Sequence, residues 1–538
     1  MFETKISSNI NHGRFARFEE IKDECELVDY VNRDGNIAGI SVSTDGKEAY
    51  VHRDDGFYIV VGATGSKKTR NVVAPYIINN TLAGNSMIIT DVKGDLYRNL
   101  SKLLKKQGYN VIVLNFNCPE KGAAYNPMKP LYTAYKKGEF DKVNRGLCNI
   151  GDMIFDSLRS EKDPYWTTTS SGYFVGCMLT LFELFDENQA TIANALNLHL
   201  QGEKKIGSNT YMKEYFDDLQ NTEAWKMLSA TVNAPNETRA SVESVYISAL
   251  NKLIGQNQSL IKMMSNSSFE AEDLLKEKTA VFIIANEVSL SVHSGLITAI
   301  IQQWYDIFVD LADENGGTLE RNIAFILDEF GNFPPVSDFQ TKVSLSRSRG
   351  IYWMIVVQSF AQLDYRYGKD VARTIIGNTA NWIYLFSPDP ELLKYVSELT
   401  GEIIDETGKK RNLLSVNQLR HFQKSNDEGR TECLMLLGRM NPFVTYLPDI
   451  SEYYGVEPIE KLDIPAREDE EVEDIDFCSI VEEKKKRLLH KMIIDKENKE
   501  RKLREEMLKK KEERRKSDPN QLSDIMDNVI CELIGGRE

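Results

Sequence analysis

The chain has 538 residues, which is enough for several domains with large cores. With 41% hydrophobic and 27% charged residues it has the composition of a globular protein, and no apolar run reaches the ~18 residues of a transmembrane helix. The net charge of −15 excludes nonspecific attraction of the whole molecule to DNA, so a DNA contact needs a local basic lining. The 7 cysteines are scattered without a Cys-x-x-Cys pair, which predicts reduced thiols, a cytoplasmic location and no zinc site.

The first motif in chain order follows a short lead-in, residues 1–56, which we predict to be β-structured or irregular. Residues 57–61 form an apolar run typical of a buried strand, and residues 62–69 then follow the phosphate-loop pattern Gly-x-x-x-x-Gly-Lys-Ser/Thr at every position but one. In such a loop, backbone N–H groups and the positive end of the next helix hold nucleotide phosphates. The residues expected to bind ATP are Gly62, Thr64, Gly65, Ser66, Lys67, Lys68, Thr69 and Arg70.

Three residues at the end of this loop decide what it can do. We expect Lys68 to contact the β- and γ-phosphates and the Thr69 hydroxyl to hold Mg²⁺. Lys67 stands where the pattern has glycine, and a left-handed backbone at that position would cost a lysine about 1–2 kcal/mol. Two interpretations stay open: a working loop with an extra positive charge, or a decayed loop that no longer hydrolyses ATP. A Gly-Ser turn with chance lysines is a third, which the motifs further along the chain disfavour.

Strand-like and helical segments alternate after the loop, which is the pattern of a parallel α/β sheet. Residues 86–92 and 111–117 are the next two predicted strands. Because ligands bind beyond the carboxyl ends of strands in such sheets, Asp91 and Lys93 should lie near the site, unless they form a solvated pair at the strand end. From about residue 140 to 270 the strand signal gives way to helical patterns, which predicts an all-α domain inserted into the sheet.

A second nucleotide signature is the strand predicted at residues 322–329, which ends in Asp328 and Glu329. Asp328 is expected in the Mg²⁺ shell, and Glu329 is expected to orient and deprotonate the attacking water. An acidic pair at a strand end is a weak signal alone. It becomes strong when a phosphate loop precedes it by about 260 residues on the same parallel sheet.

A glutamine and two arginines are further candidates for nucleotide contacts. Gln358 ends the strand predicted at residues 351–357, where its amide can sense the γ-phosphate. Arg347 or Arg349 can reach the phosphate of a neighbouring subunit and stabilise the charge of the transition state. The alternatives are a satisfied strand-end amide for Gln358 and surface or helix-capping ion pairs for the arginines.

The last part of the chain differs in composition. After strands predicted at 381–386 and 431–437, residues 467–476 are acidic and predict disorder. Residues 484–516 mix Lys, Arg and Glu with sparse apolar side chains, which predicts a long solvated helix that either tracks nucleic acid or forms a coiled coil. Residues 522–534 predict a short amphipathic segment that docks on a partner.

Together these motifs resemble those of the coupling proteins of type IV secretion and conjugation, the TraG/TraD group of the FtsK/HerA-type DNA-pumping ATPases. The resemblance covers roughly residues 50–450. Besides the loop at 62–69, the matching segments are Asp91 to Tyr97, Asn126-Pro127, Asp163 to Trp166, Asp328 to Asn332, Ser346 to Ile351, Gln358-Ser359, Tyr367-Gly368 and Ile376 to Asn378.

The resemblance implies an α/β fold: a RecA-like P-loop NTPase core with a mostly parallel sheet, interrupted by an inserted all-α domain. It divides the chain into a lead-in (1–56), a first core part (57–149), the inserted domain (150–268), a second core part (269–464) and a charged, partly helical or disordered tail (465–538).

The resemblance also implies a function. Family members assemble as homo-hexamers, recruit relaxase bound to DNA as part of the relaxosome, and feed single-stranded DNA into the type IV secretion channel using ATP and Mg²⁺. The positions that match nucleotide, metal, water-activating, finger and sensing roles are Lys68, Thr69, Asp328, Glu329, Arg347 and Gln358.

Two departures from the family pattern matter. Typical members begin with transmembrane helices, whereas this chain shows no integral span, so we expect a cytoplasmic protein, with peripheral attachment at the inner face of the cell membrane as the alternative. Lys67 leaves two functions open: an ATPase that drives DNA transfer, or a non-hydrolysing adaptor that docks relaxosome or effector substrates.

Overall fold

The computed structural model describes residues 13–33, 35–53, 56–156, 164–255, 257–404, 408–468 and 471–517. The chain divides into two compact units. The larger consists of residues up to Asn197 together with Asn221–Ile475, and the smaller consists of Leu198–Gln220 together with the residues from Asp476 onward. All the nucleotide motifs that the sequence predicts lie in the larger unit.

A nine-stranded, mostly parallel sheet forms the core of the larger unit. Its strand order is β16-β15-β12-β4-β11-β10-β5-β9-β6, in which only β12–β15 and β15–β16 pair antiparallel. The strands are β4 (Phe57–Val61), β5 (Ser86–Asp91), β6 (Asn110–Asn115), β9 (Thr279–Ile284), β10 (Ile323–Leu327), β11 (Ile351–Val357), β12 (Asn381–Tyr384), β15 (Thr431–Leu437) and β16 (Phe443–Leu447).

The central strands are covered on both faces, which explains their continuous apolar sequences. Every residue of β4, β9 and β10 is buried. In the middle of the sheet the Phe325 ring of β10 stacks on Trp353 of β11, with 4.3 Å between the ring centroids. The helices of this α/β part are α2 (Ala74–Ala83), α3 (Asp95–Lys106), α12 (Asp273–Lys276), α13 (Glu287–Glu314), α14 (Phe339–Leu345), α15 (Phe360–Tyr367), α16 (Lys369–Gly377), α17 (Pro390–Leu399) and α18 (Val416–Arg420).

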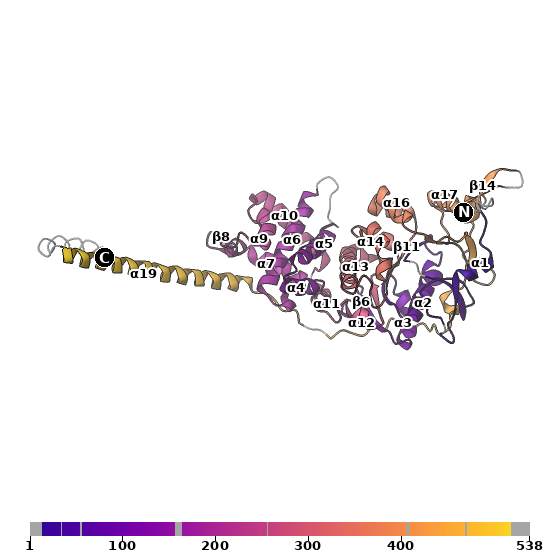
Figure 1. Ribbon diagram of the computed structural model, residues 1–538, viewed down its shortest axis with the longest axis horizontal. Helices are drawn as coiled ribbons and strands as arrows, with labels where there is room; N and C mark the ends of the chain where they lie inside the picture. Colours follow the sequence, from indigo (N-terminus) through magenta and orange to yellow (C-terminus); the bar gives the residue numbers. More distant parts are fainter. Residues whose placement is uncertain are drawn as a thin grey trace, which may run out of the picture. The chain divides into compact units, whose positions relative to one another are not determined.

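A helical region separates β6 from β9 in the chain. Its most buried member is α6, which packs against α5, α9 and α10 (Figure 1). Asp163, at the start of the predicted motif before α6, lies outside the described residues. The helices of the region are α4 (Lys129–Lys136), α5 (Phe140–Asp156), α6 (Tyr165–Leu184), α7 (Ile192–Gly202), α9 (Glu223–Val232), α10 (Asn236–Leu253) and α11 (Gln258–Ser265).

The lead-in contains α1 (Phe18–Asp23) and a three-stranded antiparallel sheet of order β1-β3-β2. Its strands are β1 (Cys25–Asp29), β2 (Gly39–Thr44) and β3 (Glu48–Arg53). A two-stranded hairpin, β13 (Glu402–Ile404) and β14 (Lys410–Asn412), follows α17. The lead-in sheet is joined to the main sheet by the Thr445 hydroxyl of β16, which donates to the Val42 carbonyl at 2.7 Å.

The acidic segment that we predicted to be disordered is an extended part of the larger unit in its described residues 467–468 and 471–475. Arg467 donates to the Pro119 carbonyl at 2.6 Å, and the Asn194 and Gln189 amides donate to the carbonyls of Glu473 and Asp474 at 2.9 Å each. Composition alone does not reveal these main-chain partners of the described residues.

The smaller unit combines a short hairpin with the long C-terminal helix. The hairpin is β7 (Lys205–Ile206) and β8 (Asn209–Thr210), followed by α8 (Tyr211–Tyr215), and the long helix is α19 (Phe477–Ser517). Lys484 of α19 donates to the Tyr215 carbonyl at 2.6 Å. The amphipathic segment predicted at 522–534 lies outside the described residues. Across the described ranges, none of the helices combines the length and the apolar character that a bilayer crossing requires.

Candidate functional site

Three neighbouring parallel strands bring the predicted motifs to one edge of the main sheet. β11 lies between β4 and β10, with Val357 opposite Val61 at the strand ends. Because all three strands run in the same direction, the phosphate loop, the Asp328-Glu329 pair and Gln358 leave the sheet at its carboxyl edge. This edge is the place where α/β sheets of this type bind ligands.

The loop backbone has the alternating conformations of a phosphate nest. Gly65 and Lys67 both adopt positive φ values, +78° and +66°, so the lysine takes the left-handed backbone that we predicted for this position. A Cβ atom on Gly62 would lie 2.6 Å from Ser66 Oγ and 3.3 Å from the Phe386 carbonyl oxygen. Gly62 is therefore required by close approach of the loop to itself and to the end of β12.

The Lys68 side chain is folded into the loop. Its amine donates to the carbonyls of Gly62 and Ala63, at 2.5 and 3.1 Å, and the residue is only 6% exposed. Burial lowers the pKa of the Lys68 amine, while the charges of Glu329 and Asp328 oppose that shift.

A buried hydroxyl in the loop tests whether an anion fits here. Among the described residues, Ser66 Oγ is buried without a hydrogen-bond partner. A phosphate oxygen accepts hydrogen bonds, so an unpaired hydroxyl in the same loop as the Lys68 amine suits a phosphate group. The residues present therefore fit the phosphates of a nucleotide.

Thr69 and Asp328 form the pair that could hold a cation. Thr69 Oγ1 donates to Asp328 Oδ2 at 2.9 Å. Burial raises the pKa of Asp328 to about 6, although the Thr69 bond and the Lys68 charge act in the opposite direction. In the part of the chain that is described, no cluster of three or more His, Cys, Asp or Glu side chains could hold a metal. One hydroxyl and one carboxylate suit Mg²⁺, which takes most of its remaining ligands from water and phosphate.

Gln358 connects the phosphate loop to Glu329. Its Nε2 donates to Glu329 Oε2 at 2.8 Å, and its Oε1 accepts from Thr64 Oγ1 at 3.1 Å. The Gln358 backbone N–H donates to the Gln362 side chain at 2.8 Å, which fixes its place after β11. Glu329 has a left-handed backbone, with φ of +57°. Strained backbone of this kind persists where the surrounding structure holds it, and it is frequent at active sites.

Asp91 and Lys93, which we expected near the site, differ from one another. Asp91 is buried at the end of β5, next to β10, and its carboxylate accepts from the Tyr97 N–H at the start of α3 at 2.8 Å. Burial raises the pKa of Asp91 to about 7, and Asp328 adds to the shift. The solvated strand-end pair is therefore wrong for Asp91, whereas Lys93 is exposed.

The two candidate arginines lie far from the loop of their own chain. Arg347 and Arg349 form a 3₁₀ turn that precedes β11, so they sit at the amino edge of the sheet, about 20 Å along the strand from Gln358. Arg349 pairs with Asp313 at 3.2 Å, which matches the ion-pair alternative. Arg347 lies against Gly56, the residue before β4.

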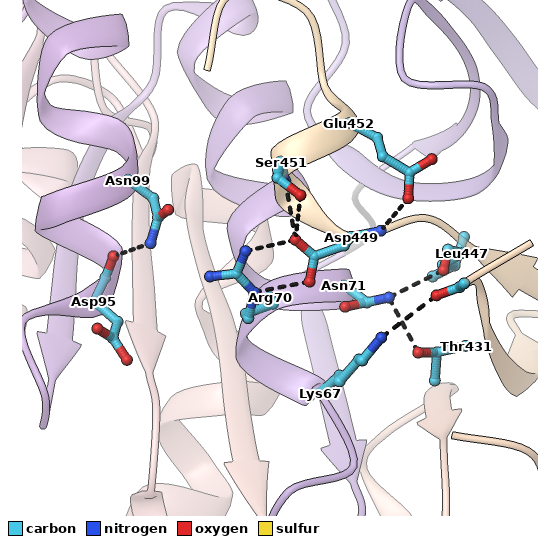
Figure 2. A network of polar contacts seen from close by, with 11 residues as sticks. Lys67, Arg70, Asn71, Asp95, Asn99, Thr431, Leu447, Asp449, Ser451 and Glu452 are labelled. Atoms are coloured by element: carbon cyan, nitrogen blue, oxygen red, sulfur yellow. Dashed lines mark hydrogen bonds and ion pairs between the residues drawn. The ribbon is translucent and has the colours of Figure 1, made fainter. Parts of the chain in front are cut away.

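Arg70, predicted to bind nucleotide, is directed away from the loop (Figure 2). Its guanidinium pairs with Asp449 through Nε–Oδ2 and Nη2–Oδ1 contacts of 2.8 and 2.5 Å, and this pair holds the pKa of Asp449 below its usual range. Asn71, the next residue, donates to Thr431 Oγ1 at 3.2 Å and to the Leu447 carbonyl at 3.0 Å. Thr69–Val73 form the π-helical turn that begins the helix after the loop and leads into α2. This helix is thus tied to the β15–β16 hairpin by Asn71 and to Asp449, just beyond β16, by Arg70, contacts for which the sequence offered no motif.

The sequence of the chain matches a known protein family. A family model described as "Type IV secretory system Conjugative DNA transfer" matches residues 17–437. The chain belongs to this family. It is 25% identical over 447 residues to the protein VirD4 of Agrobacterium fabrum, covering 81% of this chain and 64% of VirD4. It is 25% identical over 376 residues to the conjugal transfer protein TraG of the same organism, covering 68% of this chain and 54% of TraG. The chain thus spans less than two thirds of the length of these relatives.

Solved structures of the plasmid coupling protein TrwB share the fold. TrwB in complex with the ATP analogue ADPNP is 15% identical with a TM-score of 0.56, over 86% of this chain and 98% of TrwB. TrwB in complex with ADP and Mg²⁺ gives the same TM-score over 85% of this chain and 96% of TrwB. The likeness confirms the predicted fold class, a RecA-like P-loop core of mostly parallel sheet with a helical domain inserted in it.

Replacing Asp91 by asparagine should change how stability depends on pH. The folded-state pKa of about 7 lies above the ordinary 3.8, so the folded protein binds this proton more tightly, and the wild type loses stability as pH rises from about 4 through 7. Asparagine cannot ionise but keeps an acceptor for Tyr97. We expect the free energy of unfolding of Asp91→Asn, relative to wild type, to rise by on the order of 1 kcal/mol per pH unit in that window.

Denaturant unfolding at several pH values measures this difference. Asp23→Asn, which removes an exposed carboxylate of α1, is the control for the change of charge alone. A flat difference for Asp91→Asn would show that Asp91 ionises as freely as a surface carboxylate.

Proposed function

We propose that this chain is the ATPase of a type IV secretion coupling protein, which recruits relaxase bound to DNA and drives single-stranded DNA into the secretion channel during conjugation. The observation that carries the proposal is the hydrogen-bonded path from Thr64 through Gln358 to Glu329, beside the Thr69–Asp328 pair. The path joins the loop that would meet the γ-phosphate to the carboxylate that would activate water. Family membership supplies the choice of DNA transfer among the uses of such a motor.

Each residue at this edge has a chemical role in the proposal. The loop N–H groups and Lys68 bind the phosphate tail, and Thr69 and Asp328 hold Mg²⁺, which when bound neutralises charge that develops on the phosphates. Glu329 orients the attacking water and takes its proton. Gln358 couples the γ-phosphate to Glu329, because its Oε1 accepts from Thr64 in the loop and its Nε2 donates to the Glu329 carboxylate.

Glu329→Gln should separate binding from turnover. The variant keeps the volume and the Gln358 contact of residue 329 but cannot take a proton, so ATP turnover should fall by about 10²–10⁴-fold while the Kd for ATP changes little. Turnover of the wild type should rise when single-stranded DNA is added. Phosphate release and ATP binding by full-length protein measure both quantities. Lys68→Ala is the control that should lose binding itself, and DNA-independent or absent turnover in folded wild type would overturn the proposal.

A non-hydrolysing adaptor is the second candidate function, and its motivation is Lys67. The residue has a left-handed backbone, a strain of about 1–2 kcal/mol at a position where glycine is free of it. We favour the motor function because the loop keeps its nest conformation despite Lys67, and the Lys68 amine is still folded into it. In the adaptor function the same fold would dock relaxosome or effector substrates without turnover.

Lys67→Gly distinguishes the two functions. For the motor, the wild type already hydrolyses ATP, and the glycine variant should change the rate by less than about tenfold, because the nest is formed in both. For the adaptor, wild type shows no turnover and the glycine variant gains it. Steady-state ATP hydrolysis of the two proteins, with and without single-stranded DNA, gives the answer.

Arg347 supports action between subunits. Because it lies at the amino edge of the sheet, it cannot reach the loop of its own chain, and we propose that it completes the site of a neighbour in a homo-hexamer. Such an assembly would work in the cytoplasm at the inner face of the membrane, where the secretion channel opens.

Mixing two variants tests this role. Arg347→Ala keeps its own loop, and Lys68→Ala keeps its own arginine, so each alone should lose at least about 10³-fold in turnover while their mixture recovers activity at hybrid interfaces. Arg349→Ala, in the same turn but paired with Asp313, is the matched control and should stay near the wild-type rate. If Arg347→Ala is inactive and mixing restores nothing, the arginine does not act across an interface.

A further inference from the structure

The segment between α18 and β15, residues 423–430, lies beside the phosphate loop. The Lys67 amine donates to the Gly429 carbonyl at 3.4 Å, and Figure 2 shows it directed toward this segment. From the other end of the segment, the Lys424 Nζ lies 3.8 Å from the position of a Cβ on Gly65. A residue about 360 positions away in sequence therefore brings an amine over the middle of the loop.

The backbone that carries Lys424 is fixed to the helix after the loop. The Thr431 hydroxyl donates to the Lys424 carbonyl at 2.7 Å, and the same hydroxyl accepts from Asn71 at 3.2 Å. Within the segment, Asn426 Oδ1 accepts from the backbone N–H groups of Glu428 and Arg430, at 3.0 and 2.9 Å. The turn is thus internally bonded and anchored at both ends, so the place of Lys424 is set by the phosphate-loop helix.

The positive charge of the lysines at the phosphate loop favours an anionic ligand. Lys67, Lys68 and Lys424 surround one loop, and among the described residues Lys424 makes no ion pair. The acids of the site, Asp328 and Glu329, interact with Lys68 from the side of β10. Three lysines at one loop give it a positive charge that favours a polyanionic ligand.

We propose that Lys424 is a second phosphate-contacting cation of the nucleotide site, supplied by the 423–430 segment, and that Lys67 is a positioning residue that holds this segment in place through Gly429. The inference rests on the proposed nucleotide binding and goes beyond it. The ligand is the phosphate tail of a nucleoside di- or triphosphate. In this arrangement Lys67, at the position where the pattern has glycine, bonds to Gly429 and thereby holds a further cation, Lys424, at the loop.

Lys424→Gln tests the first half of the proposal. Loss of one charge-assisted contact should weaken binding of fluorescent ATP and ADP analogues about tenfold or more, whereas Lys424→Arg should retain most of it. Lys394→Gln, at an exposed lysine of α17, is the matched charge control and should bind as wild type does. Thermal unfolding of each variant confirms that the fold is kept.

The outcomes separate this inference from the proposed function. If Lys68→Ala abolishes binding but Lys424→Gln binds within twofold of wild type, Lys424 does not contact phosphate. If the wild type binds neither nucleotide, the proposed function fails, and this inference fails with it.

A double-mutant cycle on the nucleotide Kd tests the positioning role of Lys67. If Lys67 holds the segment, Lys424→Gln should weaken binding several-fold less in the Lys67→Gly background than in wild type. Equal effects in both backgrounds would show that the two lysines act independently and would overturn the positioning role.

Discussion

The parallel register of β4, β11 and β10 is the constraint on which the site depends. It places Gln358 between the phosphate loop and Glu329, so that one amide bonds to Thr64 on one side and to the carboxylate on the other. A one-residue slip of β11 would turn its side chains to the opposite face and break both bonds. The buried stacking of Phe325 on Trp353 in these strands is part of what fixes that register.

The site contains three buried ionisable groups whose charged forms are disfavoured by burial. Asp91 and Asp328 end neighbouring strands, and burial raises the pKa of both carboxyls. Lys68 is buried beside them, and burial lowers the pKa of its amine. A cation at Asp328 together with phosphates at Lys68 would relieve both penalties at once, because each ligand favours the charged form of its partner. Binding of these ligands would therefore remove part of the cost of burying the charged forms of Asp328 and Lys68, and this difference would add to the binding free energy.

The fold and much of this edge could be predicted because their signals are local. The alternation of apolar strands with helices gave the sheet, and the glycine pattern gave the left-handed position that Lys67 occupies. The rest depends on contacts between segments far apart in the chain. Arg70 was predicted to bind nucleotide because of its place in the motif, yet its side chain pairs with Asp449, which lies 379 residues further along the chain. Lys424 carries no motif at all, since its position follows from how β15 joins the sheet.

The β15–β16 hairpin has two neighbours with different roles. On one side it holds the phosphate-loop helix through Asn71 and Arg70, and on the other Thr445 bonds to Val42 of the lead-in sheet. Arg430, in the turn that carries Lys424, also donates to the Thr44 carbonyl at 3.2 Å. The lead-in sheet, the turn that carries Lys424 and the phosphate loop are therefore joined by one set of hydrogen bonds, so a displacement of the lead-in sheet would also shift this turn.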